Sequence, residues 1–394
     1  MIAQNQEQTT KQIAIQGVDV LTPTGWLPEA TVIIEEGKFL SINQTPSPPK
    51  AIKIEAQGLK MLPGIVDIHG DAFERMICPR PGVSFPLAIA IEENDHNLIA
   101  SGITTFFYSI TDSYEPGLRS RETARAIIEL ILSARKKHLR ADSRIHIRHE
   151  ETNTADYLEL CDWLASGVVN LLSLADHLPP PGNDYKLNRH LNSLRQRLKM
   201  SELELKTLIN QAQVRREEGN QQVEELVKFA HQYQVPLASH DDDTPEKVEL
   251  SRARGVAIAE FPARVELAAQ SRHYGAAVLM GAPNLVRGGS HVGQISVTEA
   301  AQQGVLDCLC SDYHYPSLFH APFKLAELGL LPFEQAWQLV SAHPAAAAGI
   351  DDAKGSIAPG LEADFLLVNP NKSLPSAIAA VYVAGQEAAR YLSR

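Results

Sequence analysis

The middle of the chain repeats one pattern that few folds can accommodate, a short apolar run followed by a segment of helical periodicity. The runs are rich in Val, Ile and Leu and are short enough to be buried strands. Eight strands, most of them followed by a helix, predict an α/β fold of the (β/α)8 barrel type rather than an open doubly wound sheet. No GxGxxG, GxxxxGKS or GxxxxGKT motif follows a run, which argues against nucleotide-binding folds. The eight runs span residues 64–69, 103–110, 144–150, 168–176, 235–240, 256–261, 276–281 and 305–312.

Both ends of the chain have a different pattern, with short alternating strands and turn signals. We expect residues 1–60 and 355–394 to form one composite β-sandwich domain around a barrel of residues 61–354. Residues 184–234 are too long and too highly charged for an ordinary crossover, and they predict inserted helices over one end of the barrel. This insertion is interpreted either as a solvated pair of crossover helices or as a lid or dimerisation element.

The overall charge limits the partners of the chain. Thirty-six basic and 47 acidic residues give a net charge of −11, so we expect no nucleic acid and no anionic membrane as partners. The N-terminus lacks a basic and apolar leader, and no apolar run reaches the ~20 residues of a membrane span. We expect a cytoplasmic protein, with a homodimer suggested by its size and extra helices. Cys308 and Cys310 stand in an apolar run and are predicted to be buried.

Several of the predicted strands end in residues that bind metals. A single histidine there is usually a structural residue, and a single aspartate is usually a helix cap. Five such strand ends together favour a metal site, because active sites of barrels lie at the carboxyl ends of the strands. These ends are His69-Gly70-Asp71, His149-Glu150, Asp176-His177, Ser239-His240-Asp241 and Ser311-Asp312.

The spacing of these residues suggests two divalent metal ions. His69 and Asp71 are two residues apart on a strand, so both side chains can reach one ion. Glu150 can bridge two ions, while His177 and His240 complete the second site. Asp312 is predicted both to bind metal and to accept a proton from water. Zinc is the first expectation, with manganese, iron and magnesium as alternatives. A bound metal would lower the pKa of a water molecule and supply hydroxide near neutral pH.

The motifs around these residues resemble those of the amidohydrolase superfamily. The resemblance rests on LPGIVDIHGD after the first β-layer and on GSIAPGLEADFLLV near the C-terminus. A narrower group, the diphosphatases of the C–P lyase pathway of phosphonate metabolism, is similar over several longer segments. These segments are PGIVDIHGD (63–71), ASGITT (100–105), ASHDD (238–242), IAEFP (258–262), VLMGAPNLVRGGSH (278–291) and SDYHYPSL (311–318).

This resemblance implies hydrolysis of α-D-ribose 1-methylphosphonate 5-triphosphate to the 5-phosphate and pyrophosphate. The chain departs from the wider superfamily in two ways. The usual HxH is HxD here, and the two later histidines follow strands four and five rather than five and six. An amidohydrolase acting on a C–N bond, such as a cyclic amide hydrolase, deacetylase or deaminase, is the alternative function. A metal-free scaffold is disfavoured because every expected ligand position is filled.

A phosphorylated sugar substrate requires local positive charge in an acidic protein. In the loop PNLVRGGSH, Arg287, Ser290 and His291 supply donors, and the adjacent glycines allow close approach of the backbone. A plain surface turn is the alternative for this loop. Arg80, just after the first strand, is a second substrate-binding candidate. Arg148 lies beside His149 and Glu150, and its side chain could point either inward or outward.

Overall fold

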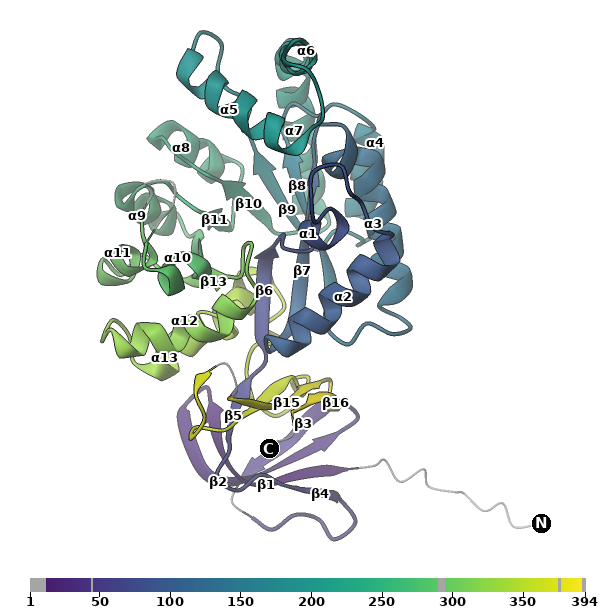
Figure 1. Cartoon of the computed structure of the whole chain (residues 1–394). Helices are drawn as coiled ribbons and strands as arrows, with labels where there is room; N and C mark the ends of the chain where they lie inside the picture. Colours follow the sequence, from purple (N-terminus) through teal and green to yellow (C-terminus); the bar gives the residue numbers. More distant parts are fainter. Residues whose placement is uncertain (1–11, 44, 290–294, 375–376, 392–394) are drawn as a thin grey trace, which may run out of the picture.

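The computed structural model describes residues 12–43, 45–289, 295–374 and 377–391 of the chain. Within this part, eight parallel strands lie in one sheet, each paired with the next in chain order (Figure 1). The predicted barrel and the position of every predicted strand are confirmed. The strands are β6 (Ile65–Gly70), β7 (Ile103–Asp112), β8 (Asp142–Glu150), β9 (Leu171–Ala175), β10 (Leu237–His240), β11 (Ile258–Glu260), β12 (Ala277–Gly281) and β13 (Cys308–Cys310).

The last and first strands of the barrel are bridged at their carboxyl ends, beside the metal-ligand residues. The amide of Asp312 donates to the carbonyl of His69 at 3.0 Å, and the amide of Asp71 donates to the carbonyl of Asp312 at 2.9 Å. Gly70 allows this approach, because a Cβ there would lie 2.5 Å from Phe106 and 2.8 Å from the hydroxyl of Ser311. The pairing of β6 with β7 is irregular between Asp67 and Gly70, at the point where His69 turns into the barrel.

Helices cover the outside of the barrel, and apolar side chains fill its inside. The interior contains a cluster that includes Ile68, Phe107 and Leu279, together with Cys308 and Cys310, whose predicted burial is confirmed. The surrounding helices are α2 (Leu87–Ala100), α3 (Arg121–Ala134), α4 (Tyr157–Ala165), α7 (Arg216–Gln232), α8 (Pro245–Ala253), α9 (Val265–His273), α10 (Ala282–Arg287), α11 (Val297–Gln302), α12 (Pro316–Glu327), α13 (Phe333–Gln338) and α14 (Ala342–Ala347).

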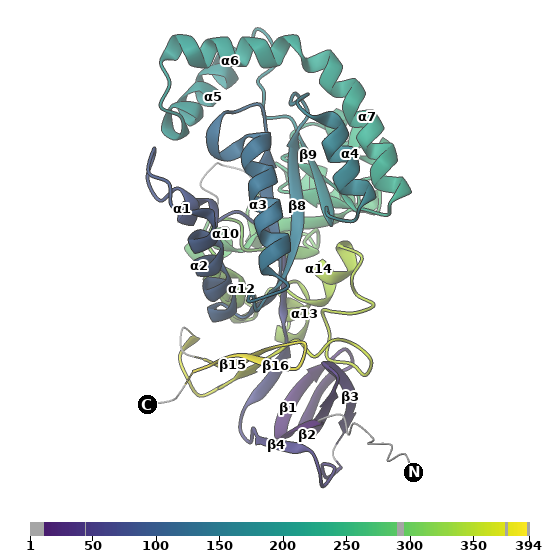
Figure 2. The same ribbon diagram turned by 90° about the vertical axis from the view of Figure 1, so that its right-hand side faces the viewer.

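The helical stretch between β9 and β10 has two parts. Helix α7 packs against α4 and is an ordinary barrel helix. Helices α5 (Asp184–Arg197) and α6 (Glu202–Val214) are additional, and they lie over the carboxyl ends of the strands (Figures 1 and 2). A capping box between Ser201 and Glu204 starts α6. The two helices share a small core of Leu178, Leu191, Leu194, Leu205 and Ile209.

Strands from both ends of the chain form a separate sheet, as the sequence predicted. Strand β14 pairs with β5, which joins the C-terminal and N-terminal parts, and most pairs are antiparallel. The sheet lies at the end of the barrel opposite α5 and α6 (Figure 2). It contains β1 (Ile13–Thr22), β2 (Gly25–Glu35), β3 (Lys38–Asn43), β4 (Ile52–Glu55), β5 (Lys60–Pro63), β14 (Phe365–Val368), β15 (Ile378–Val383) and β16 (Gln386–Arg390).

No helix in the described ranges is long and apolar enough to cross a membrane.

Candidate metal centre and active site

Two sets of possible metal ligands lie at the carboxyl ends of the barrel strands. The first contains His69, His240 and Glu260, and the second contains His177, His240 and Asp241. Within each set, one ligand atom from every residue lies within 4.8 Å of the others. The first set is enclosed by the barrel, since the side chains of His69 and Glu260 are almost fully buried and that of His240 is 6% exposed. Imidazole and carboxylate are the ligand types of catalytic zinc sites.

Glu260, at the end of β11, is a site residue that the sequence reasoning missed. Its Oε1 accepts a hydrogen bond from Nδ1 of His69 at 2.8 Å, and its Oε2 accepts one from Ser173 at 2.8 Å. Burial opposes ionisation of this carboxyl, but His69 and His146 lower its pKa below the ordinary value. The available signal was a single acidic residue at the end of an apolar strand, in the IAEFP segment that was noted for its resemblance alone.

The nitrogens of His240 fit a metal ligand. Among the described residues, its Nδ1 is buried without a hydrogen-bond partner, and it lies 3.4 Å from Oδ2 of Asp241. The same carboxylate oxygen lies 3.6 Å from Nε2 of His177. Two imidazole nitrogens therefore converge on one carboxylate. Such a set fits a divalent cation, because buried polar atoms otherwise need hydrogen-bond partners.

Arg148 lies inside the barrel, which settles the alternative that the sequence left open. Its guanidinium donates to Oδ2 of Asp71 and to Nε2 of His240, both at 3.1 Å. Asp71 is thus held by Arg148 and belongs to neither ligand set. His149, the next residue on β8, faces outward and contacts Asp112 at 2.7 Å. The alternation of side chains along a strand separates these neighbours.

Glu150 and His177 contact each other directly, and Glu150 is in neither of the two metal-ligand sets. Oε2 of Glu150 accepts from the amide of His177 at 3.2 Å, and Oε1 contacts the imidazole Nδ1. The carboxylate raises the pKa of His177, while that imidazole lowers the pKa of the buried Glu150 carboxyl. Nε2 of His177 remains directed toward Asp241. Glu150 therefore orients this histidine in the structure.

Asp312 is half-buried and forms the bridge with Gly70 that joins the last strand of the barrel to the first. Burial and the neighbouring Asp71 raise its pKa to about 6. A side chain at position 281 would crowd it, because a Cβ on Gly281 would lie 3.2 Å from Oδ2 of Asp312. The glycine therefore leaves room beside the carboxylate at the mouth of the barrel.

Three residues at these strand ends have left-handed backbone conformations. The φ angles are 56° at Asp241, 55° at Phe261 and 52° at Asp312. Aspartate tolerates this region, but a phenylalanine there costs energy, of the order of 1–3 kcal/mol. Phe261 packs against the rings of His69 and His240, with centroid distances of 4.9 and 5.4 Å. The strained turn thus places an aromatic wall beside two ligand histidines.

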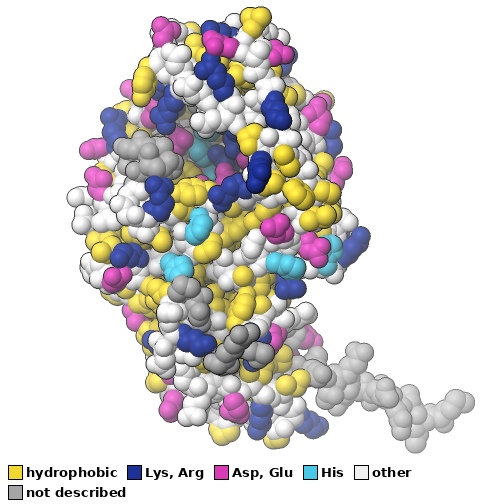
Figure 3. Space-filling model, in the orientation of Figure 1, with side chains coloured by type: hydrophobic (Ala, Val, Ile, Leu, Met, Phe, Trp, Pro, Cys, Tyr) yellow, Lys and Arg dark blue, Asp and Glu magenta, His cyan; other side chains and the backbone are white. Residues whose placement is uncertain are grey.

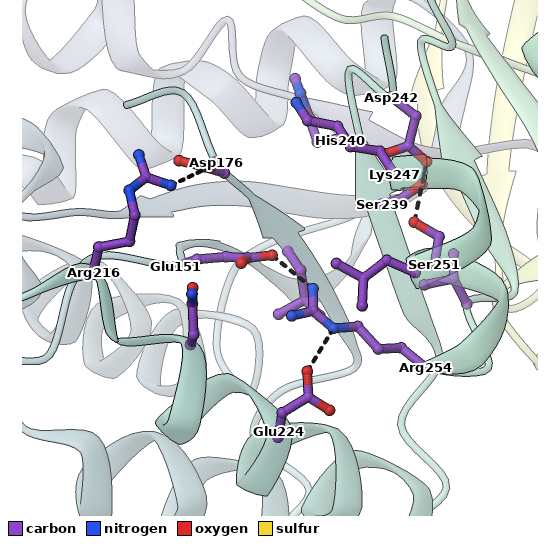
Figure 4. Close-up of a pocket in the computed structure, with 14 residues that line it drawn as sticks. Glu151, Asp176, Arg216, Glu224, Ser239, His240, Asp242, Lys247, Ser251 and Arg254 are labelled. Carbon is purple, nitrogen blue, oxygen red and sulfur yellow. Dashed lines mark hydrogen bonds and ion pairs between the residues drawn. The ribbon is translucent and has the colours of Figure 1, made fainter. Parts of the chain in front are cut away.

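A polar cavity of about 390 Å³ lies behind the ends of β9 and β10 (Figure 4). Arg254 spans it and donates to Glu151 at 2.7 Å and to Glu224 at 3.0 Å. On the other side, Asp242 accepts from Ser239 at 2.7 Å and from Ser251. These contacts join α7 and α8 to the strand ends. The hydrogen bonds around this cavity therefore support the segment that carries His240.

Of the four predicted substrate-binding residues, the structure describes Arg287 and Arg80. Arg287 ends α10, and its guanidinium donates to the hydroxyl of Tyr313 at 3.0 Å. Arg80 is exposed on the loop after α1 (Glu74–Ile77). Ser290 and His291 lie outside the described residues. Figure 3 shows basic side chains around a hollow below the helices of the insertion.

Comparison with known proteins agrees with this barrel fold. The model of the amidohydrolase family matches residues 61–388, which is most of the chain. The chain belongs to the amidohydrolase family. Over 322 residues it is 33% identical to the α-D-ribose 1-methylphosphonate 5-triphosphate diphosphatase of Escherichia coli strain K12, covering 80% of this chain and 85% of that protein. Both findings support a hydrolase.

Solved structures share the fold at lower identity. A putative prolidase from Bifidobacterium longum is 17% identical with a TM-score of 0.64, covering 97% of this chain and 95% of that one. The N-acetylglucosamine-6-phosphate deacetylase of Pasteurella multocida is 12% identical with a TM-score of 0.63, covering 96% and 100%. At these identities the likeness concerns the fold alone.

Proposed function

We propose that the enzyme hydrolyses α-D-ribose 1-methylphosphonate 5-triphosphate to the 5-phosphate and pyrophosphate. The observation that carries this proposal is the 33% identity to the E. coli diphosphatase over 80% of the chain. In this reaction the anhydride bond between the first and second phosphates breaks. Water supplies the oxygen that one product gains and the proton that balances the charge on the other.

The proposal includes two divalent metal ions, with zinc as the first expectation. His69, His240 and Glu260 would hold one ion, and His177 and Asp241 would contribute to a second. Asp71, Glu150 and Asp312 stay in the proposal as further ligands from the sequence pattern. Bound divalent metal would lower the pKa of a coordinated water and polarise phosphoryl oxygens.

The chain's own residues would then orient the reactants and move the proton. Asp312 is half-buried at the barrel mouth, with space beside Gly281, and we assign it the role of general base. Arg148 holds Asp71 and His240 from inside the barrel and adds positive charge where phosphate oxygens would gather. Arg287 and Arg80 would bind phosphate groups, and Ser290 and His291 would add donors. The proposal places the enzyme in the cytoplasm, with a homodimer as the expected assembly.

The test is a direct product assay. Purified protein supplied with zinc is incubated with the ribose methylphosphonate triphosphate, and phosphorus NMR follows pyrophosphate release. Asp312→Asn should reduce kcat by about 10²–10⁴, the usual contribution of a general base. Absence of pyrophosphate from the wild-type reaction would overturn the proposal. Release of ammonia or a free amine from cyclic amides or acetylated amines would favour the C–N hydrolase instead.

A further inference from the structure

A cleft of about 380 Å³ opens at the mouth of the barrel beside the inserted helices. Its walls come from the loop after α1, the loop around η1 (Gly117–Arg119) and the C-terminal end of α5. This volume is within the range of about 300–1,000 Å³ that is usual for small-molecule sites. The lining carries five basic and two acidic side chains: Arg75, Arg80, Arg119, Arg197 and Lys199, with Glu74 and Glu115. A local excess of positive charge is notable in a chain of net charge −11.

Two of the basic residues are paired, and the pairs build the walls of the cleft. Arg119 makes two hydrogen bonds to Glu74, at 2.8 and 3.2 Å. Arg197, at the end of α5, makes two to Glu115, at 2.7 and 3.3 Å. The second pair attaches the insertion to the loop that follows β7. The insertion is therefore held against the barrel mouth by a bidentate contact.

The other three basic residues carry the excess charge. Within the described ranges, no ion pair to a carboxylate involves Arg75, Arg80 or Lys199. Lys199 is exposed and extends over Gly82, where an added Cβ would lie 2.3 Å from its Nζ. The insertion and the loop that carries Arg80 thus meet at a glycine that leaves room for the lysine.

Residues that line the cleft contact the rim of the candidate active site. The amide of Glu74, in its floor, donates to the carbonyl of Asp71 at 3.0 Å. Arg75 contacts the carbonyl of Tyr313, and Arg287 donates to the hydroxyl of the same tyrosine. A ligand group at the ends of the strands could therefore extend along the rim into the cleft.

We propose that this cleft is a subsite for a polyphosphate chain, and that the insertion contributes Arg197 and Lys199 to it. The identity of the ligand as the phosphate end of the substrate rests on the proposed function. Guanidinium and ammonium groups are the side chains that bind phosphate, and charge in a concave site is more effective than on a flat surface. A neutral amide substrate would gain no electrostatic stabilisation from this positive charge.

Binding of inorganic pyrophosphate to the full-length protein tests the inference by isothermal titration calorimetry. The double variant Lys199→Ala with Arg80→Ala removes two unpaired charges and no buried group. We expect its affinity for pyrophosphate to fall at least 10-fold, with a much smaller change for orthophosphate. The matched control removes Arg195 and Lys206, which lie on α5 and α6 and pair with Glu202 outside the cleft.

The control variant should bind pyrophosphate as the wild type does. The inference would be overturned if the cleft variant and the control variant had the same affinity for pyrophosphate, whether both matched the wild type or both were weakened equally. A protein that binds pyrophosphate through the cleft but releases none from the sugar triphosphate would refute the proposed function and leave this inference standing. Normal hydrolysis of the sugar triphosphate, with pyrophosphate binding that does not depend on the cleft residues, would support the proposed function and refute this inference.

Discussion

Replacing Lys354 with methionine should destabilise the contact between the barrel and the terminal sheet. The side chain of Lys354 is 2% exposed, and its Nζ lies 2.8 Å from Asp364, 2.5 Å from Glu362 and 3.5 Å from Asp142. Asp142 begins β8 of the barrel, whereas Asp364 directly precedes β14 of the sheet. Methionine keeps most of the volume but removes the charge, so the three carboxylates lose their shared partner.

The expected cost follows from the burial of each carboxylate. The side chains of Glu362 and Asp142 are 36% and 30% exposed and can be solvated after the change. Asp364 is 5% exposed and keeps one hydrogen bond, from the amide of Ala384 at 2.7 Å. Breaking a buried pair costs about 3–5 kcal/mol, and with one buried carboxylate we expect the lower end, about 3 kcal/mol.

Urea and thermal unfolding, followed by circular dichroism, would measure this loss. For domains of 150–250 residues, 3 kcal/mol corresponds to a fall in Tm of about 6–12 °C. The control is Lys324→Met, which removes an exposed pair with Glu327 and should cost less than about 1 kcal/mol. Equal stability of the Lys354 variant and the wild type would refute the reasoning.

The pH dependence gives an independent check. Burial raises the pKa of Asp364 above its ordinary value even beside Lys354, and loss of the lysine should raise that pKa further. The folded variant then binds a proton more readily than its unfolded chain. Its stability therefore falls as the pH rises from the pKa of Asp364 in the unfolded chain to the higher pKa in the folded protein. The difference from wild type should therefore be smaller at pH 5 than at pH 8. A constant difference would show that the charge of Asp364 is not the cause.

Three further predictions concern the barrel mouth. Glu260→Gln should weaken zinc binding by about 10–100-fold or more, measured against a chromophoric chelator, and unchanged affinity would exclude this carboxylate from the centre. Gly70→Ala should cost about 1–3 kcal/mol of unfolding free energy by chemical denaturation, because its Cβ would lie 2.5 Å from Phe106; a neutral result would show that the junction relaxes freely. Arg287→Ala should raise KM for the triphosphate about 10-fold or more in steady-state assays, since guanidinium–phosphate contacts are charge-assisted, whereas an unchanged KM would place Arg287 outside the substrate site.

The sequence predicted the strand ends better than the contacts among them. His69 and His240 end strands that were recognised from their apolar runs, and both enter the first ligand set. Glu260 was missed because one acidic residue inside IAEFP looks like any polar strand end until closure of the barrel brings its carboxylate against His69 of the first strand. Asp241 was noted only within the strand end Ser239-His240-Asp241, and the structure places it in the second set.

The side chain of Arg148 shows the limit of local reasoning. Alternation along β8 indicates that Arg148 and His149 face opposite ways, but not which of them faces inward. Only closure of the barrel decides this, because it fixes which face of every strand is interior. Once closed, the barrel directs Arg148 to Asp71 and His240, residues 77 and 92 positions away along the chain.

By itself, the sequence determined the local features of this protein. The repeated apolar runs specify eight strands and their crossovers, and the alternating ends specify the second sheet, because periodicity and turn residues act over short distances. The tertiary structure alone decided which ligand-type residues face one another and where the insertion lies. Contacts such as Arg197 with Glu115, and His69 with Glu260, join segments that are distant along the chain. Such contacts depend on barrel closure and helix packing, which no local pattern records.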